Sequence, residues 1–332
     1  MVVRVFQVDR SPRMMPYAFE HEAIRRAGGE FVVDHCTSET EIVERAQGAE
    51  ILFVAGSRLV TPVVMDALPR CRLIARWAVG YDIIDVEAAT ARGIAVANSP
   101  SYCSEEVAEH TIGLLFAVAR RFVVSHERMR RGEWQHPGGQ IHRLATRTLG
   151  IIGCGRIGSK VAARALGLGI HVVAHDAYRS SEALRATGVT PRTFDEVLAE
   201  ADYVTVHVPL SAETRHLIDA SALAKMKPEA MLINTSRGPV IDESALIEAL
   251  SSGRLAGAAL DVFEEEPLDP ASPLLSLEQV VLTPHYAAYS VESIDALRRE
   301  ICQTAASWIA DGWSENVVNP EVREKLRPRS PR

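Results

Sequence analysis

The chain has 332 residues, 47% of them hydrophobic and 24% charged, which is enough to bury the cores of two domains. Its formal net charge of −7 excludes the broad basic surface that nucleic acids or anionic membranes require. The five cysteines form no CxxC or Cys/His cluster, and no apolar run reaches the roughly 18 residues of a membrane helix, so we expect a cytoplasmic, metal-free protein.

Strand-like and helix-like segments alternate through the first hundred residues. The strand-like runs read "VVRVFQV", "EFVVD", "EILFVAG", "RLIARWA" and "GIAVAN", and "PYAFEHEAIRRAG" is typical of the amphipathic helices between them. This alternation predicts a first α/β unit.

A long apolar segment follows, from Ser104 to Trp134. It reads "SEEVAEHTIGLLFAVARRFVVSHERMRRGEW", with acids at its start and bases at its end, as the helix dipole favours. We expect one long helix followed by an arm. Because the segment is too rich in Leu, Phe and Val for a lone surface element, it also predicts a two-fold homodimer.

A second series of buried-looking strands occupies the rest of the chain. The runs "RTLGIIGCG", "IHVVAHD", "DYVTVHVPL", "EAMLINTS", "LAGAALDVF" and "QVVLTPH" are separated by helix-length intervals, as in a parallel sheet that is covered on both faces. A final helix is predicted at "SVESIDALRREICQTAASWIADG", and the polar tail "EKLRPRSPR" is expected to be disordered.

The first strand of this second series ends in a glycine-rich turn. Gly153, Gly155 and Gly158 have the GxGxxG spacing, with Arg156 and Ile157 completing the turn before a helix-forming run. Such glycines allow a tight turn and a close approach of pyrophosphate, and the helix N-terminus attracts phosphate. The turn therefore predicts a dinucleotide site.

An acidic residue at the end of the next strand indicates which dinucleotide binds. Asp176 lies 23 residues after Gly153 (176 − 153), where a carboxylate binds both ribose hydroxyls of NAD and repels the 2′-phosphate of NADP. Arg179, three residues further on, works against this preference. NAD is the expected cofactor.

Three later strand-end segments each contain an ionisable residue: Arg237, Glu266 and His285. The carboxyl ends of parallel strands line one crevice, so these residues are expected to converge. Arg237 would bind the carboxylate and carbonyl of a 2-oxo acid, His285 would exchange a proton with that oxygen, and Glu266 would orient the imidazole.

Each of these residues also has a structural interpretation. Arg237 could lie on the surface, Glu266 could be one of three solvated glutamates, and His285 could cap a backbone group. Glu264 and Glu265 are expected to be solvated, and packing or backbone roles are expected for other histidines. His207 ends a strand, which places it beside the expected cofactor.

The sequence resembles the D-isomer-specific 2-hydroxyacid dehydrogenase family over nearly its whole length. The resemblance rests on "GIIGCGRIG", "HVPLSAETRHLID", "NTSRGPVIDESAL", "GAALDVFEEEP", "LTPHYAAYS" and, upstream, "AVGYDIIDVEAATARGIAVANSP". It implies two Rossmann-like, doubly wound parallel-sheet domains. The substrate domain would be split between residues 1–98 and 288–332, and the NAD-binding domain would span 99–287.

The resemblance also implies roles for particular residues. Arg237, Glu266 and His285 would be catalytic, and Glu266 is favoured over its neighbours because it directly precedes a proline. The Val79 and Gly80 amides would bind the substrate carboxylate. The residues implied at the cofactor are Asp261, close to the nicotinamide carboxamide, together with Thr111 and Thr235.

The expected activity is the NAD-dependent interconversion of a D-2-hydroxy acid and its 2-oxo acid by a homodimer. A phosphorylated substrate is not expected, because Ala55 stands where phosphoglycerate-oxidising members carry an arginine. The C-terminal-binding-protein branch of the family gives an alternative, an NAD(H)-binding, corepressor-like protein with little turnover. Here "YAAYS" follows the histidine, where that branch has a tryptophan.

Overall fold

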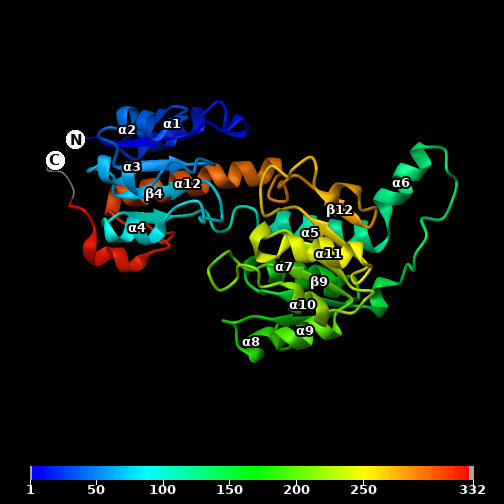
Figure 1. Ribbon diagram of the computed structural model, residues 1–332. Coiled ribbons are helices and arrows are strands. Elements are labelled where there is room, and N and C mark those ends of the chain that lie inside the picture. The colour runs from blue at the N-terminus through cyan, green and yellow to red at the C-terminus, as the bar shows by residue number, and fades with distance from the viewer. Residues whose placement is uncertain (1, 329–332) are drawn as a thin grey trace. The chain divides into compact units, whose positions relative to one another are not determined.

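The computed structural model describes residues 2–328, apart from the side chain of Arg13, and divides the chain into two compact units. Unit 1 comprises the residues up to Cys103 and those from Ser290 onward, and unit 2 spans Ser104–Tyr289. Figure 1 shows the chain, with helices α1 to α12 and some of the strands labelled.

Unit 1 contains a five-stranded parallel sheet in the order β2-β1-β3-β4-β5. Four of the five strands lie within the runs predicted from the sequence, and β2 begins one residue before its run, at Gly29. They are β1 (Val3–Gln7), β2 (Gly29–Val33), β3 (Ile51–Val54), β4 (Leu73–Arg76) and β5 (Ala95–Ala97).

The helices of unit 1 include one supplied by the far end of the chain. They are α1 (Ala18–Arg26), α2 (Glu39–Arg45), α3 (Pro62–Ala67), α4 (Val86–Ala91) and α12 (Val291–Asp311), with short 3₁₀ segments η1 (Pro12–Met14) and η5 (Pro320–Lys325). Ser290 caps α12 by accepting the Ser293 amide. The helix then packs against α1 and β4 and buries Trp308 completely.

The polar tail is ordered as far as the structure describes it, so the prediction of disorder was wrong for residues 324–328. The Arg327 guanidinium donates hydrogen bonds to the carbonyls of Met65, Leu68, Cys71 and Arg92. The composition of the segment indicated that it would be solvated. However, these carbonyls lie at or just beyond the C-terminal ends of α3 and α4, where helical hydrogen bonding stops and another donor is needed. Residues 329–332 lie outside the described part of the chain.

Unit 2 contains a seven-stranded parallel sheet in the order β12-β11-β10-β9-β6-β7-β8. The strands are β6 (Thr148–Ile152), β7 (His171–His175), β8 (Thr190–Pro191), β9 (Tyr203–Val206), β10 (Met231–Asn234), β11 (Gly257–Leu260) and β12 (Val280–Leu282). The two-residue edge strand β8 was not predicted, because it is too short to show a pattern. The two doubly wound sheets confirm the predicted fold class.

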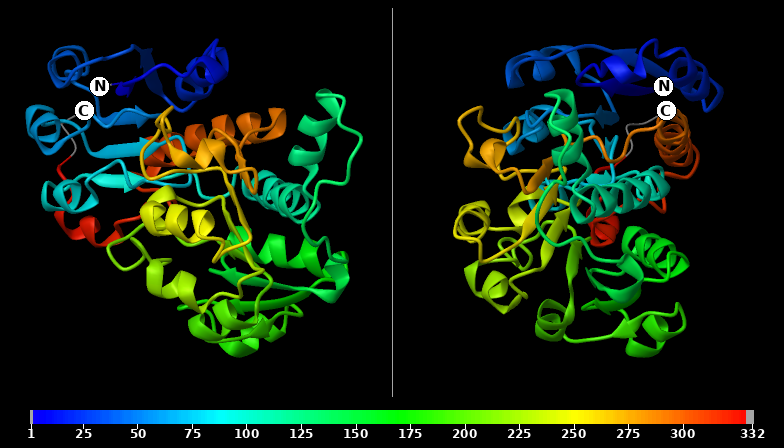
Figure 2. Two further views of the ribbon diagram at one scale, coloured as in Figure 1. Left: turned by 45° about the vertical axis from the view of Figure 1, so that its right-hand side comes forward. Right: turned by 90° about the vertical axis from the view of Figure 1, so that its right-hand side faces the viewer.

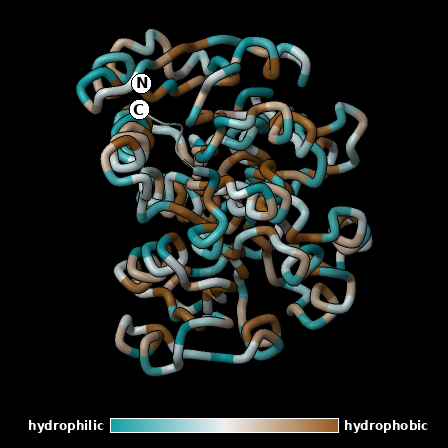
Figure 3. Tube along the Cα trace, turned by 90° about the vertical axis from the view of Figure 1, so that its left-hand side faces the viewer, coloured by the Kyte–Doolittle hydropathy of each residue, from teal (hydrophilic) through white to brown (hydrophobic). Residues whose placement is uncertain are grey.

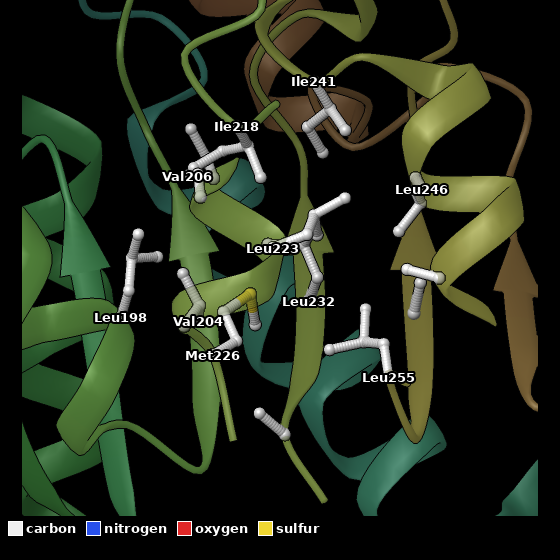
Figure 4. Close-up of a cluster of buried hydrophobic side chains, with 14 of the residues drawn as sticks. Leu198, Val204, Val206, Ile218, Leu223, Met226, Leu232, Ile241, Leu246 and Leu255 are labelled. Atoms are coloured by element: carbon white, nitrogen blue, oxygen red, sulfur yellow. The ribbon is translucent and has the colours of Figure 1, made fainter. Parts of the chain in front are cut away.

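Helices cover both faces of this sheet. They are α5 (Ser104–Ala119), α6 (Phe122–Arg130), α7 (Arg156–Gly167), α8 (Ser181–Arg185), α9 (Phe194–Glu200), α10 (Ala220–Lys225) and α11 (Glu243–Ser251), with η2 (Leu144–Thr146), η3 (Gly238–Val240) and η4 (Pro273–Ser276). Figure 4 shows one of the resulting cores, in which Leu223 and Leu246 from helices meet Val204 and Leu232 from strands.

The predicted long helix is instead two helices. Arg121, between α5 and α6, has φ 53°, a left-handed conformation that interrupts helical hydrogen bonding. None of the nine described residues of α6 is buried, and Figure 2 shows this helix extending away from the sheet of unit 2. Because α6 has no core to pack against, the apolar pattern of this segment did not produce one continuous helix.

Hydropathy follows this architecture. In Figure 3 the hydrophobic segments concentrate in the interior of each unit, and hydrophilic segments predominate at the turns. The five cysteines are free and buried. Among residues 2–328, no helix has both the length and the hydropathy of a membrane span.

Candidate functional site

The register of the unit 2 sheet aligns the ends of six strands. His175, Ile152, Val206, Asn234, Leu260 and Leu282 are paired in sequence across β7, β6, β9, β10, β11 and β12. The next residues in the chain are therefore Asp176, Gly153, His207, Thr235, Asp261 and Thr283. Five of these six were predicted as cofactor residues, and the sheet brings them to one edge.

The three glycines of the turn differ in what a side chain at each position would contact. Gly153 has φ 88°, and a Cβ there would lie 2.8 Å from the His207 backbone. A Cβ on Gly158 would lie 2.1 Å from the Gly153 oxygen. By contrast, apart from Gly155 itself and its two chain neighbours, no described residue has an atom within 4 Å of where a Cβ would stand on Gly155. This open space at the N-terminus of α7, next to Arg156 and Ile157, fits a pyrophosphate group.

The carboxylate of Asp176 is tied to the backbone around it. Oδ2 accepts the Cys154 amide at 2.7 Å, and Oδ1 accepts the amides of Tyr178 at 2.9 Å and Arg179 at 3.0 Å. Arg179 Nη1 in turn donates to the Cys154 carbonyl at 2.7 Å and to Ser159 Oγ at 2.8 Å. Asp176 and Arg179 thus hold the glycine turn by binding the amide and the carbonyl of the same residue, Cys154.

Two further residues expected at the cofactor lie close to each other. Thr111 donates to the Val107 carbonyl at 2.7 Å, so its oxygen accepts from the Thr235 hydroxyl at 2.9 Å. This contact joins α5 to the end of β10. His207 lies 3.0 Å from Thr205 Oγ1, and burial lowers the pKa of its imidazole from 6.5 to about 3. It is therefore neutral at physiological pH.

Arg237 reaches its position through a turn that only glycine can complete. The Asn234 side chain holds the turn by accepting the Ser236 amide at 2.9 Å and donating to the Arg237 carbonyl at 2.9 Å. A Cβ on Gly238 would lie 1.8 Å from the Phe263 oxygen. The absence of a side chain at 238 therefore lets the Arg237 loop pack directly against the loop that carries Glu266.

Glu266 and His285 form a close pair. Glu266 Oε2 lies 2.6 Å from His285 Nδ1, and Oε1 accepts the Phe263 amide at 3.0 Å. Burial raises the pKa of Glu266, but the bonds to His285 and Phe263 and the charges of His285 and Arg237 outweigh it and lower the pKa below 4.5. The carboxylate thus binds one ring nitrogen and leaves Nε2 for a substrate.

The neighbouring glutamates differ from each other. The Glu264 carboxylate is bonded to His216 Nε2, and its amide donates to Glu243 Oε2 at 3.1 Å. Glu264 is partly exposed, with 29% of its side chain accessible, and is also paired with His216. Glu265 is exposed, as expected.

Asp261 is fully buried and organises the loop that carries His285. Its Oδ1 accepts the Thr283 hydroxyl at 2.6 Å and the Tyr286 amide at 3.1 Å, and Oδ2 accepts the Ala287 amide at 2.9 Å. Sequence reasoning did not identify Thr283, although it occupies the sixth place in the row of strand ends. The only available signal was its position directly after β12.

The predicted carboxylate binders belong to unit 1. Val79 and Gly80 follow β4, and the Val79 carbonyl accepts a bond from Asn98 Nδ2 at 2.6 Å. Within residues 2–328 neither of their amides donates a hydrogen bond. The described residues also contain no group of three or more His, Cys, Asp or Glu arranged to hold a metal ion.

Comparison with known proteins gives a consistent result. A family model described as D-isomer specific 2-hydroxyacid dehydrogenase, NAD binding domain, matches residues 112–287. The chain is 41% identical over 295 residues to a glyoxylate reductase of Korarchaeum cryptofilum, covering 88% of this chain and 89% of that one. It is 40% identical over 301 residues to a D-3-phosphoglycerate dehydrogenase of Methanocaldococcus jannaschii, covering 90% of this chain but 57% of that protein.

A solved structure of similar fold carries both kinds of ligand. The D-lactate dehydrogenase from Aquifex aeolicus, complexed with NAD and lactic acid, superposes with a TM-score of 0.82 at 28% identity. The match covers 99% of this chain and 100% of that one. The chain belongs to the D-isomer specific 2-hydroxyacid dehydrogenase family and is an NAD-dependent enzyme of that family.

Proposed function

We propose that this enzyme interconverts a D-2-hydroxy acid and its 2-oxo acid, with Arg237, His285 and Glu266 at the reacting centre. The observation that carries the proposal is the 2.6 Å contact between Glu266 and His285, together with the influence of the Arg237 charge on Glu266. A base with an orienting carboxylate and an adjacent guanidinium suits proton exchange with an anionic substrate.

The side chains divide the work of reduction. Arg237 binds the substrate carboxylate and polarises the carbonyl oxygen. NADH, when bound, supplies the hydride to the carbonyl carbon. His285 donates the proton on Nε2 to the oxygen as it becomes a hydroxyl, and Glu266 holds the opposite ring nitrogen throughout. Oxidation of the hydroxy acid runs the same proton transfer in reverse.

The carboxylate of Asp176 supports a preference for NAD over NADP. Its negative charge stands at the end of β7, where the 2′-phosphate of NADP would approach it. Arg179, the nearby cation that could offset this repulsion, is engaged by the Cys154 carbonyl and Ser159. A bound ribose would accordingly meet the acid rather than the arginine.

The substrate of this proposal is an unphosphorylated acid. In unit 1, Asp9 accepts the amides of Ala55 at 2.8 Å and Ser57 at 2.9 Å, and also that of Gly56. Backbone amides grouped in this way bind anions, and here the chain supplies the anion itself. A substrate phosphate would have to displace a buried carboxylate to use this loop.

Homodimer formation through unit 2 is part of the same proposal. Phe122, Val123, Met129 and Trp134 are all exposed in the region of α6, and Trp134 exposes 86% of its surface. Apolar side chains gathered in this way are typical of an interface. Light scattering at micromolar concentration should give twice the mass of the chain, whereas a monomer mass would contradict this part of the proposal.

A panel of 2-oxo acids tests the activity. NADH consumption should be measured with glyoxylate, hydroxypyruvate, pyruvate, a branched, an aromatic and a phosphorylated 2-oxo acid, using wild type and His285→Ala. We expect turnover of at least one unphosphorylated acid and its near loss in the variant. Turnover that persists unchanged in His285→Ala would refute the assigned site, and no turnover of any acid by wild type would favour a binding protein.

A further inference from the structure

His110 is joined to the loop that carries His285, although it lies on a different element. It belongs to α5, which packs against β10, β11 and β12. Its Nε2 lies 3.1 Å from Thr283 Oγ1, and its ring meets the Tyr286 ring edge-on, with the ring centres 4.9 Å apart. His110 therefore contacts this loop on both sides of His285.

The protons in this contact have one consistent arrangement. The Thr283 hydroxyl has a single proton, and it donates that proton to Asp261 Oδ1 at 2.6 Å. The hydroxyl can then offer His110 only a lone pair, so His110 Nε2 carries a hydrogen and acts as the donor. Burial lowers the pKa of His110 and outweighs the opposing effect of Asp261, which keeps the ring neutral at physiological pH.

Asp261, which accepts the Thr283 hydroxyl, also hydrogen-bonds to the backbone around His285. The Asp261 carbonyl accepts the His285 amide at 2.8 Å, and its carboxylate accepts the amides of Tyr286 and Ala287. His285 itself has φ 48°, a left-handed conformation that a non-glycine residue adopts at some cost. The surrounding hydrogen bonds hold that conformation and keep the ring within reach of Glu266.

We propose that His110 is a positioning residue for His285, acting through the Thr283 hydroxyl and the Asp261 carboxylate. The inference rests on the proposed function, because it assigns His110 a role in the proton transfer carried out by His285. His110 does not need to touch the substrate. Its N–H fixes Thr283, its ring fixes Tyr286, and the two contacts together set the position of the catalytic imidazole.

Two substitutions separate the donated hydrogen bond from the packing. His110→Phe keeps an aromatic ring against Tyr286 but removes the N–H donor, whereas His110→Gln places an amide N–H where Nε2 stands. Thr283→Val removes the same link from the other side and keeps the shape of the side chain. His171, exposed at the start of β7, supplies the matched control pair His171→Phe and His171→Gln.

Two readouts distinguish positioning from a general loss of structure. Steady-state kinetics with NADH and the best 2-oxo acid should show kcat lowered roughly tenfold in His110→Phe and Thr283→Val, with KM for NADH unchanged. His110→Gln should recover most of this loss. Without any ligand, amide hydrogen exchange at Tyr286 and Ala287 should accelerate roughly threefold to tenfold in His110→Phe but not in His110→Gln.

The outcomes separate this inference from the proposed function. If His285→Ala abolishes turnover while His110→Phe and Thr283→Val both match wild type in kcat and exchange, the positioning role is wrong and the active site stands. If His285→Ala itself turns over normally, the proposed function fails first. Equal losses in His110→Phe and His110→Gln would also overturn the inference, because packing rather than the N–H would then be responsible.

Discussion

The two units have related sheets but differ at the point where the strand order of each sheet reverses. In unit 1 the strand order reverses between β1 and β3, and in unit 2 it reverses between β6 and β9. Such switch points are where open α/β sheets bind ligands. In unit 1 the chain's own Asp9 binds the amides there, whereas in unit 2 the turn at Gly155 stays open.

The difference shows that topology supplies a crevice and local residues decide what occupies it. After β6 the chain enters α7 at once, so that the amides of a helix N-terminus face the turn. After β1 it runs through η1, and α1 begins only at Ala18. The contrast is explained by the Asp9 carboxylate in unit 1 and by the three glycines of the turn, Gly153, Gly155 and Gly158, in unit 2.

The largest effect is expected from removing the proposed proton donor of unit 2 while leaving its glycine turn intact. His285→Ala should slow 2-oxo acid reduction by roughly 10²- to 10⁴-fold, because general acid catalysis is lost. The affinity for NADH, measured by fluorescence titration, should stay close to wild type. A parallel loss of NADH affinity would show that the loop also shapes the cofactor site.

Filling the open turn should make unit 2 resemble unit 1. Gly155→Ala introduces a methyl group with no atom within 4 Å beyond those of the residue itself and its two chain neighbours, so the melting temperature should change little. The same methyl group occupies the pyrophosphate space, and the dissociation constant of NADH should rise roughly tenfold or more. Gly167→Ala, at the other end of α7 and equally uncrowded, is the matched control and should bind NADH normally.

Removing the internal anion should destabilise unit 1 and spare the cofactor site. Asp9→Ala leaves the amides of Ala55, Gly56 and Ser57 without their acceptor, which should cost roughly 3–5 kcal/mol of unfolding free energy. Urea denaturation measures the loss, with the exposed Glu87→Ala as control. NADH affinity that fell together with stability would argue against this division of roles.

The smallest expected effect is a pH dependence of stability in unit 2. His207 titrates near 6.5 when unfolded and near 3 when folded, so between these values the unfolded chain binds more protons. Stability should therefore fall as pH falls through this window, by on the order of 2 kcal/mol at pH 4.5. His207→Gln should flatten the dependence in urea denaturation at pH 7.5 and 4.5, and an unchanged slope would contradict the assignment.

The sequence predicted most of the fold because buried parallel strands are apolar throughout. Eleven strand-like runs correspond to β1–β7 and β9–β12, and only the two-residue β8 was missed. The break at Arg121 was not predictable from apolar spacing, since it depends on how much core α6 finds. The ordered tail was missed because Arg327 binds carbonyls that are distant in sequence.

Site residues could be proposed from the sequence where an ionisable residue directly follows a predicted strand. Arg237, Glu266 and His285 were proposed in this way, and the sheet register explains why the loops that carry them lie at one edge of the sheet. Roles that depend on three-dimensional contacts were not visible. Asp261 was expected at the cofactor, yet its side chain is enclosed and binds the His285 loop, and neither Thr283 nor Asp9 was identified.

The proposed role of Arg237 in substrate binding can be tested by single-turnover kinetics. Single-turnover NADH oxidation with a reactive 2-oxo acid should be compared between wild type and Arg237→Lys, which keeps the charge but loses the planar fork that binds a carboxylate and a carbonyl together. We predict weaker substrate binding and slower hydride transfer, with NADH affinity unchanged. Wild-type rate and affinity in Arg237→Lys would show that the arginine is structural and would contradict the proposed substrate site.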